Sequence, residues 1–172
     1  MEGRRGNEEG RPPAYLVALV RHVEDLRDDT HGGVAERGQK EALFVQAADW
    51  LAPVAMGVLE ELDAVALLST GEIADSGMER EDDGTLARSW TLSWPEQRDR
   101  GLEPVTLRAW FGGGSHHPHV RAATVHDWPL NVYEESDARD LLPVLRSAVA
   151  ADVHHLVFQS DWRIIPAAGR RD

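Results

Sequence analysis

With 172 residues and no cysteine, the chain is long enough to form one domain that buries roughly 70% of its unfolded surface without disulfides or a structural metal. The lack of cysteine excludes thiolate nucleophiles, iron–sulfur clusters and cysteine-ligated zinc. A formal net charge of −12, with no stripe of Lys and Arg, argues against a nucleic-acid partner.

The first predicted helix begins at Pro12 and Pro13, where a missing backbone N–H costs little. Its apolar residues recur with the spacing of one helix face, and they are Leu16, Leu19, Val20, Val23 and Leu26. The helix is expected to end at the segment DDTHGG, where Gly32 or Gly33 is free to adopt a positive φ. Residues 1–11 are polar and charged and are predicted to form a disordered tail.

A longer second helix is predicted from an apolar face made of Phe44, Ala47, Ala48, Leu51, Ala55, Val58, Leu59 and Leu62. Pro53 lies inside this segment and removes one helical hydrogen bond, so we expect a kink or a break near Ala52.

A third helix is predicted near the C-terminus, with one face made of Leu141, Leu142, Leu145, Ala148, Val149, Val153 and Leu156. A short strand, WRIIP, and a tail at residues 168–172 are expected after it.

From residue 64 the apolar period changes from 3.6 to 2, which predicts strands. The segments AVALLSTG and GEIADSGMERE are expected to be short strands around a turn at Gly71, and Asp83-Gly84 has the sequence of a tight hairpin turn. In the strands that follow, one face is made of Leu86, Trp90, Leu92 and Trp94, and then of Val105, Leu107, Ala109 and Phe111. A further strand is predicted over residues 119–125.

Strands that follow one another without intervening helices favour antiparallel pairing. The order of elements therefore predicts an α+β fold, in which an antiparallel β-sheet is covered on one face by N-terminal and C-terminal helices. No internal repeat or linker interrupts residues 12–167, which we expect to form a single domain.

Four of the eight histidines lie within eleven residues, in the segment HHPHVRAATVH at 116–126. Because side chains alternate across a strand, His117, His119 and Arg121 are expected to share the face opposite the core. Arg108 and Trp110 of the preceding strand are expected to project from the same face, and Trp128 is expected to add to an aromatic wall. This segment is the predicted functional site.

One interpretation of the site is a divalent metal centre with zinc, iron or manganese. His-x-His on a strand places two imidazoles together, so His117 and His119 are candidate ligands. His126 is the candidate third ligand, and His31, Glu36 and Asp127 are alternatives that the spacing does not distinguish. His22 is instead expected to lie on a solvated ion-pair surface.

A second interpretation is acid–base or nucleophilic chemistry by His117 and His119, with Arg108 and Arg121 binding an anionic substrate. The segment HPHVR resembles the His-Pro-His motif of the histidine-triad and nucleotidylyltransferase superfamily. This resemblance implies that His119 is the nucleophile and that Arg121 stands where the family has His or Gln.

Two further interpretations are ligand binding without chemistry and an ordinary polar loop. The sequence favours a cytoplasmic small-molecule enzyme with a His/Arg site for a carboxylate or phosphate, with or without a metal. The alternative function is a non-catalytic interaction or ligand-binding module with an acidic surface.

No membrane partner is expected, because no segment approaches the ~20 apolar residues of a membrane span. A homo-oligomer is left open.

Overall fold

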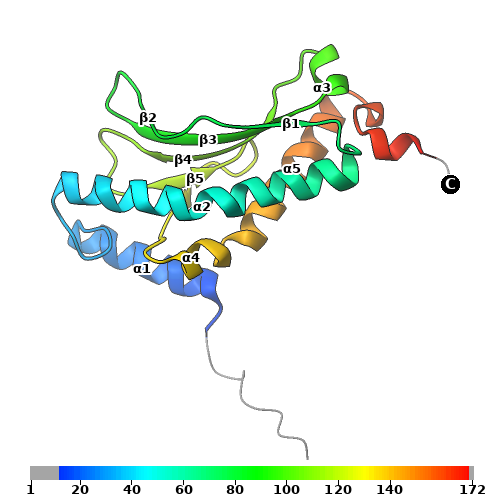
Figure 1. Ribbon diagram of the computed structural model, residues 1–172. Helices are drawn as coiled ribbons and strands as arrows, with labels where there is room; N and C mark the ends of the chain where they lie inside the picture. Colours follow the sequence, from blue (N-terminus) through cyan, green and yellow to red (C-terminus); the bar gives the residue numbers. More distant parts are fainter. Residues whose placement is uncertain (1–11, 171–172) are drawn as a thin grey trace, which may run out of the picture.

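Within residues 12–170, which the computed structural model describes, six strands form one antiparallel sheet (Figure 1). The strands are β1 (Glu72–Asp75), β2 (Glu79–Arg80), β3 (Leu86–Ser93), β4 (Val105–Phe111), β5 (His119–Arg121) and β6 (Trp128–Pro129). Their spatial order is β1-β3-β4-β5-β6, and β2 pairs with β3 beyond the end of β1. The predicted tail at 1–11 and the last two residues of the tail at 168–172 lie outside the described residues.

Helices α2 (Arg37–Ala66) and α5 (Leu142–Gln159) cover one face of this antiparallel sheet, which confirms the predicted α+β class (Figure 1). The other helices are α1 (Ala14–Asp28), α3 (Pro95–Asp99) and α4 (Glu135–Asp140), and two 3₁₀ turns follow, η1 (Trp162–Ile164) and η2 (Pro166–Gly169). By length and composition alone, α2 and the run from Glu135 to Gln159 could cross a membrane. In this fold both pack one side into the core, as core helices of globular domains do. The expectation of no membrane partner stays a prediction.

Alternation along β4 separates the two faces of the sheet. Val105, Leu107, Ala109 and Phe111 are buried, and the residues between them are half-buried. The predicted core residues of β3 are also buried, as is Trp94, whose indole Nε1 donates to the carbonyl of Ile164 at 2.6 Å. Local alternation therefore predicted which face the helices cover. The opposite, open face holds Arg108 and Trp110.

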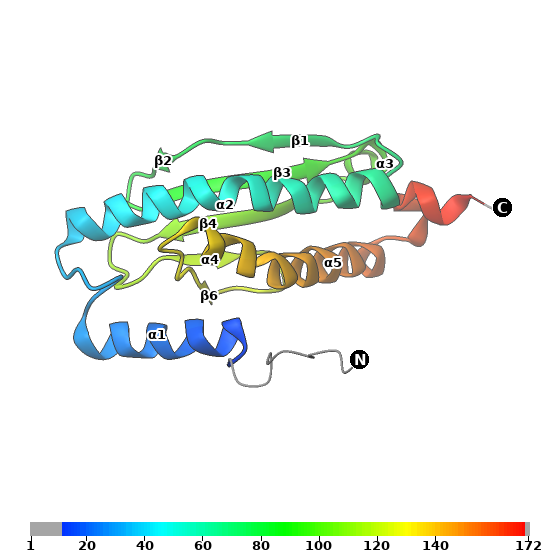
Figure 2. The same cartoon turned by 60° about the horizontal axis from the view of Figure 1, so that its bottom comes forward.

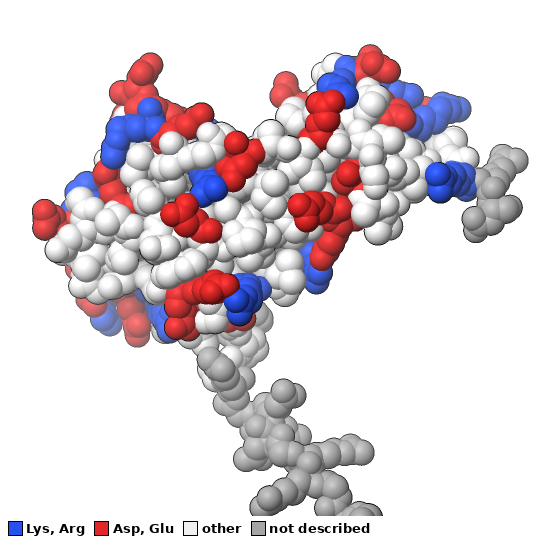
Figure 3. Space-filling view, viewed as in Figure 1, with Lys and Arg blue, Asp and Glu red and all other residues white. Residues whose placement is uncertain are grey.

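Charged side chains are spread over the surface. On the face that Figure 3 draws, acidic and basic side chains of the described residues are interspersed and form no continuous basic stripe. Such a surface agrees with the expectation of no nucleic-acid partner, which stays a prediction.

The second helix is longer and more regular than predicted. α2 continues through Pro53 without a break and ends at Ala66, so the strand predicted for AVALLSTG is wrong. Buried residues on both sides of the proline hold the helix against the sheet. The chain reverses only where Leu68 and Ser69 adopt left-handed φ values of 57° and 61°.

Two other strand predictions are corrected. β5 ends at Arg121, because the Asp152 carboxylate accepts hydrogen bonds from the backbone of Ala123 and Thr124 and curls the predicted strand into a turn. The segment WRIIP contains the 3₁₀ turn η1 instead of a strand, since the Asp161 side chain caps it by accepting from the backbone N–H of Arg163.

α1 does not cover the face of the sheet, as was expected of the N-terminal helices. The helix lies beside the β6 edge of the sheet (Figure 2). Its apolar side chains form the predicted stripe, but they point to solvent. The side that faces the protein carries the half-buried His22 and the buried Asp25, and the Asn131 amide donates to the Ala18 carbonyl at 2.7 Å. The solvated ion-pair surface predicted for His22 is therefore wrong.

Leu107→Ala should lower the free energy of unfolding by about 2–5 kcal/mol, because it leaves a cavity in the middle of the core. Thr106→Ala, the neighbouring position on the open face, should cost about 1 kcal/mol or less. Urea unfolding measures both values. Equal losses at the two positions would contradict the assignment of the faces.

Candidate functional site

Four histidines from distant parts of the chain converge beside the β5 and β6 edge. His22 comes from α1, His31 from the loop before α2, His117 from the loop before β5, and His119 is the first residue of β5. The centroid of the His117 ring lies 4.8 Å from that of His22 and 5.7 Å from that of His31. The centroids of His22 and His119 are 5.9 Å apart. His117 is the centre of this group, which we call the histidine cluster.

The loop after α1 fixes His31 in the cluster. The backbone N–H of His31 donates to the carbonyl of Val34 at 2.9 Å, and Val34 donates back to His31 at 3.2 Å. Gly32 adopts the positive φ that the sequence predicted, and a Cβ atom there would lie 2.6 Å from the Tyr133 ring. Only glycine satisfies both requirements, and the close approach brings the Tyr133 ring to 5.1 Å from that of His31.

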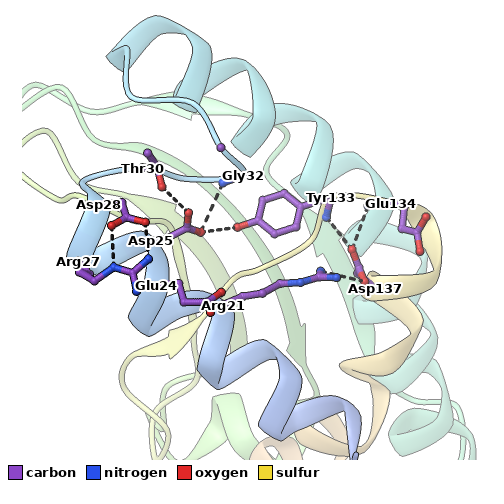
Figure 4. Close-up of a pocket in the computed structure, with 11 residues that line it drawn as sticks. Arg21, Glu24, Asp25, Arg27, Asp28, Thr30, Gly32, Tyr133, Glu134 and Asp137 are labelled. Carbon is purple, nitrogen blue, oxygen red and sulfur yellow. Dashed lines mark hydrogen bonds and ion pairs between the residues drawn. The ribbon is translucent and has the colours of Figure 1, made fainter. Parts of the chain in front are cut away.

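A buried carboxylate, Asp25, adjoins the cluster, and Figure 4 shows the groups that donate hydrogen bonds to it. It accepts hydrogen bonds from the Thr30 hydroxyl at 2.7 Å, from the Tyr133 hydroxyl at 2.9 Å and from the Gly32 backbone N–H at 3.4 Å. Burial raises the pKa of Asp25, but these hydrogen bonds outweigh it and hold the pKa below its ordinary value. The carboxylate is therefore ionised at neutral pH.

Asp25, His31 and His117 lie close enough together that they could hold a metal ion. All three are buried, and each offers one ligand atom within 4.8 Å of the other two. Within the described chain, His31 Nε2 and both ring nitrogens of His117 are buried without a hydrogen-bond partner, as are one nitrogen each of His22 and His119. Buried polar atoms normally have partners, so this concentration of unsatisfied nitrogens beside an anion requires an explanation.

Electrostatics keeps the imidazoles uncharged. Burial, together with neighbouring histidines and Lys40, lowers the pKa values of His31 and His117 to about 4. Burial also lowers the pKa values of His22 and His119. Lys40, the single lysine, is itself buried and pairs with Asp29 at 3.4 Å. Neutral imidazoles have a free lone pair, which is the form that binds metal ions.

Four of the predicted site residues lie together on the open face. Trp110 pairs with His119 across the β4–β5 ladder, and their rings stack with centroids 5.3 Å apart. Arg108 pairs with Arg121 in the same ladder, and the Arg121 guanidinium lies 5.8 Å from the Trp110 ring. Arg108 is bound by the Glu81 carboxylate at 2.6 Å. Arg121 is exposed and forms no ion pair within residues 12–170.

Two more of the predicted site residues, Trp128 and His126, lie outside both this arrangement and the histidine cluster. Trp128 pairs with Val120, whose side chain points to the core, and Trp128 packs against the core too. It therefore does not form a wall with Trp110. His126 is exposed, and it makes none of the ring contacts that join the histidine cluster within the described chain. The early end of β5 explains this position.

An open pocket of about 720 Å³ lies on the outer side of Asp25 and Tyr133 (Figure 4). Its charged lining residues are Arg21, Glu24, Asp25, Arg27, Asp28, Glu134 and Asp137, an excess of acids. Arg27 is already paired with Asp28 at 2.7 Å, and Arg21 lies 4.0 Å from Asp137. The net negative lining favours the approach of cations toward Asp25.

Comparisons with models of known protein families, with curated protein sequences and with solved structures found no match to this chain. The chemistry of the site is therefore inferred from its own residues and their geometry.

In the metal-free protein, the free energy of unfolding should fall as the pH drops from 6.5 toward 4. Below pH 6.5 the unfolded chain protonates its histidines, whereas folded His31 and His117 remain neutral until about pH 4. Acid therefore favours the unfolded state, by up to ~1.4 kcal/mol per pH unit for each histidine. Above pH 6.5 these histidines are neutral in both the folded and the unfolded state, so their titration no longer changes the free energy of unfolding.

Urea unfolding in the presence of a chelator measures this slope. His117→Gln should reduce it, because one of the two strongly shifted imidazoles is removed. His155→Gln, on the exposed side of α5, should leave it unchanged. Identical slopes for wild type and His117→Gln would show that the imidazole is not held neutral by burial.

Proposed function

We propose that the protein is a metal-dependent enzyme of small-molecule chemistry that binds one divalent cation through Asp25, His31 and His117. The observation that supports it is the group of three buried ligand atoms within 4.8 Å of one another. The buried ring nitrogens of His31 and His117 that lack a hydrogen-bond partner in the described chain would each gain a favourable interaction by binding a cation.

The donor set suggests which cations fit. Two imidazoles and one carboxylate suit zinc, iron(II) or manganese(II), and three protein ligands leave coordination positions for water or substrate. A cation held there would supply Lewis-acid chemistry or an activated water molecule. His22, whose ring touches that of His117, is the nearest further imidazole. The cation is thus assigned to Asp25 and His31 in place of His119 and His126.

The open face supports the second half of the proposal, an anionic substrate. Arg121 offers an exposed guanidinium without an ion-pair partner in the described chain, beside the Trp110 ring. A planar guanidinium matches a carboxylate or phosphate in two hydrogen bonds. His119 lies between this face and His22, so it is placed to hold or transfer a proton near a bound substrate. Arg108 contributes less, because Glu81 neutralises it.

The alternative, a non-catalytic interaction module, has one observation in its favour. The exposed side of α1 is apolar instead of acidic, and an apolar patch of this kind is typical of a contact surface. A contact surface is compatible with an enzyme, so this observation does not weaken the metal proposal.

Tag-free wild-type protein incubated with zinc, iron(II) or manganese(II) and then desalted should retain close to one cation per chain, as measured by elemental mass spectrometry. His117→Ala and His31→Ala should weaken binding by more than the ~10–100-fold that follows loss of a residue that only orients a ligand. His154→Ala, an exposed histidine on α5, should retain full binding. Circular dichroism checks that each variant is folded.

Asp25→Asn distinguishes a role of Asp25 in binding the cation from a role in packing, because it keeps the size of the side chain but removes its charge. It should lower the affinity for the cation while leaving the fold intact. Wild-type protein that retains none of the three cations, or His117→Ala protein that retains as much as wild type, would refute the metal centre.

In the metal-loaded protein, malonate or inorganic phosphate should raise the temperature of thermal unfolding by binding beside Arg121. Arg121→Gln should abolish the shift, because the guanidinium supplies the charge and both hydrogen bonds. Arg139→Gln, a surface arginine paired with Glu135, serves as the matched control. A shift that survives Arg121→Gln would place anion binding elsewhere.

A further inference from the structure

The outward side of α1 is an apolar surface that no part of the described chain covers. Its large side chains have exposed fractions of 40–56%, and they are Tyr15, Leu16, Leu19, Val20, Val23 and Leu26. Figure 2 shows α1 at the margin of the molecule, with its outer side away from the sheet and the other helices. We call these six residues the α1 stripe.

The spacing of the α1 stripe is that of a seam between two helices. Leu16, Leu19, Val23 and Leu26 follow one another at intervals of three, four and three residues. This 3-4 alternation is the pattern in which side chains of one helix fit between those of another. A stripe that exists only to cover a core would point inward, but this one is fixed outward by the polar contacts of Ala18 and Asp25.

The area of the stripe suits a symmetric contact. Six side chains that are about half exposed present on the order of 500 Å² of apolar surface, near the upper range for a monomeric protein. Two such surfaces pressed together would bury about 1,000 Å² before any flanking residue is counted, which reaches the lower range of specific interfaces. A second copy of the chain is therefore a sufficient partner.

The charges of α1 favour the same partner. The six stripe residues are uncharged, and Arg27, which projects from the C-terminal end of the same side of α1, is paired with Asp28. Two copies can approach without like charges meeting. A membrane surface fits less well, because the chain carries a net charge of −12 and interfacial helices usually present Lys and Arg beside the apolar side.

We propose that the α1 stripe is the interface of a homodimer in which two copies of α1 pack antiparallel. Leu19 then lies against the partner's Val23, and Tyr15 and Leu16 lie against the partner's Leu26. The arrangement is closed by a two-fold axis near the middle of the helix, so it does not propagate into a filament. The proposal is independent of the metal centre and stands whether or not a cation is bound.

Sedimentation equilibrium of the full, tag-free chain at about 1–100 µM tests the dimer, because its population depends on concentration. The wild type should have twice the mass of one chain at the upper end of this range. Leu19→Glu should raise the dissociation constant at least ~30-fold, because it puts a charge at the centre of the seam. Val65→Glu is the matched control, since Val65 is 75% exposed at the end of α2, and it should not change the dimer.

The chain has no cysteine, so introduced thiols can report the orientation of the helices. In the antiparallel dimer, Leu19→Cys protein mixed with Val23→Cys protein should form mixed disulfides faster than Leu19→Cys protein alone. A wild type that remains a single chain at the highest concentration would overturn the proposal. So would a dimer that Leu19→Glu leaves intact, or a monomer that binds phosphatidylcholine vesicles through the stripe.

Discussion

The polar contact between α1 and the segments that flank β5 and β6 is the interaction on which the candidate site depends. The Asp25 carboxylate accepts from Tyr133, the Asn131 amide donates to the Ala18 carbonyl, and the His22 ring packs on His117. Hydrogen bonds are directional, so they fix how α1 is rotated about its own axis. That rotation brings His22 and Asp25 to the histidine cluster and turns the α1 stripe to solvent.

This rotation has a cost on both sides of the helix. On the outward side of α1, apolar side chains stay in water and do not gain the stabilising free energy of roughly 25 cal/mol per Å² that burial would contribute. On the inward side, imidazole nitrogens are buried without hydrogen-bond partners in the described chain, which is unfavourable. A cation bound by these nitrogens would remove this unfavourable burial, and its ligands would come from α1, from the loop after α1 and from the segment before β5. It would therefore link three segments that contribute no residue to the hydrophobic core of the described chain.

Sequence reasoning was most successful where a local rule decides the structure. Alternation assigned the core face of β4 and placed Arg108, Trp110, His119 and Arg121 on the open face. It failed where a distant residue intervenes, as when Asp152 ends β5 and leaves His126 outside the site. The largest error concerned α1, which was expected among the N-terminal helices that cover the sheet. The roles of His22 and Asp25 follow only from the helix rotation, which periodicity alone does not encode.

The two sides of α1 connect the proposed metal centre with the proposed dimer, because each of them would hold the helix in the same rotation. A cation would hold the inner side through Asp25, whereas a second copy would hold the outer side through Leu19 and Val23. Each contact alone would stabilise the same rotation, because turning α1 to bury its stripe would remove Asp25 from Tyr133. Dimerisation should therefore favour the arrangement that the cation requires, and cation binding should favour the surface that the dimer uses. Thermodynamic linkage makes this mutual support reciprocal, so one coupling free energy describes both directions.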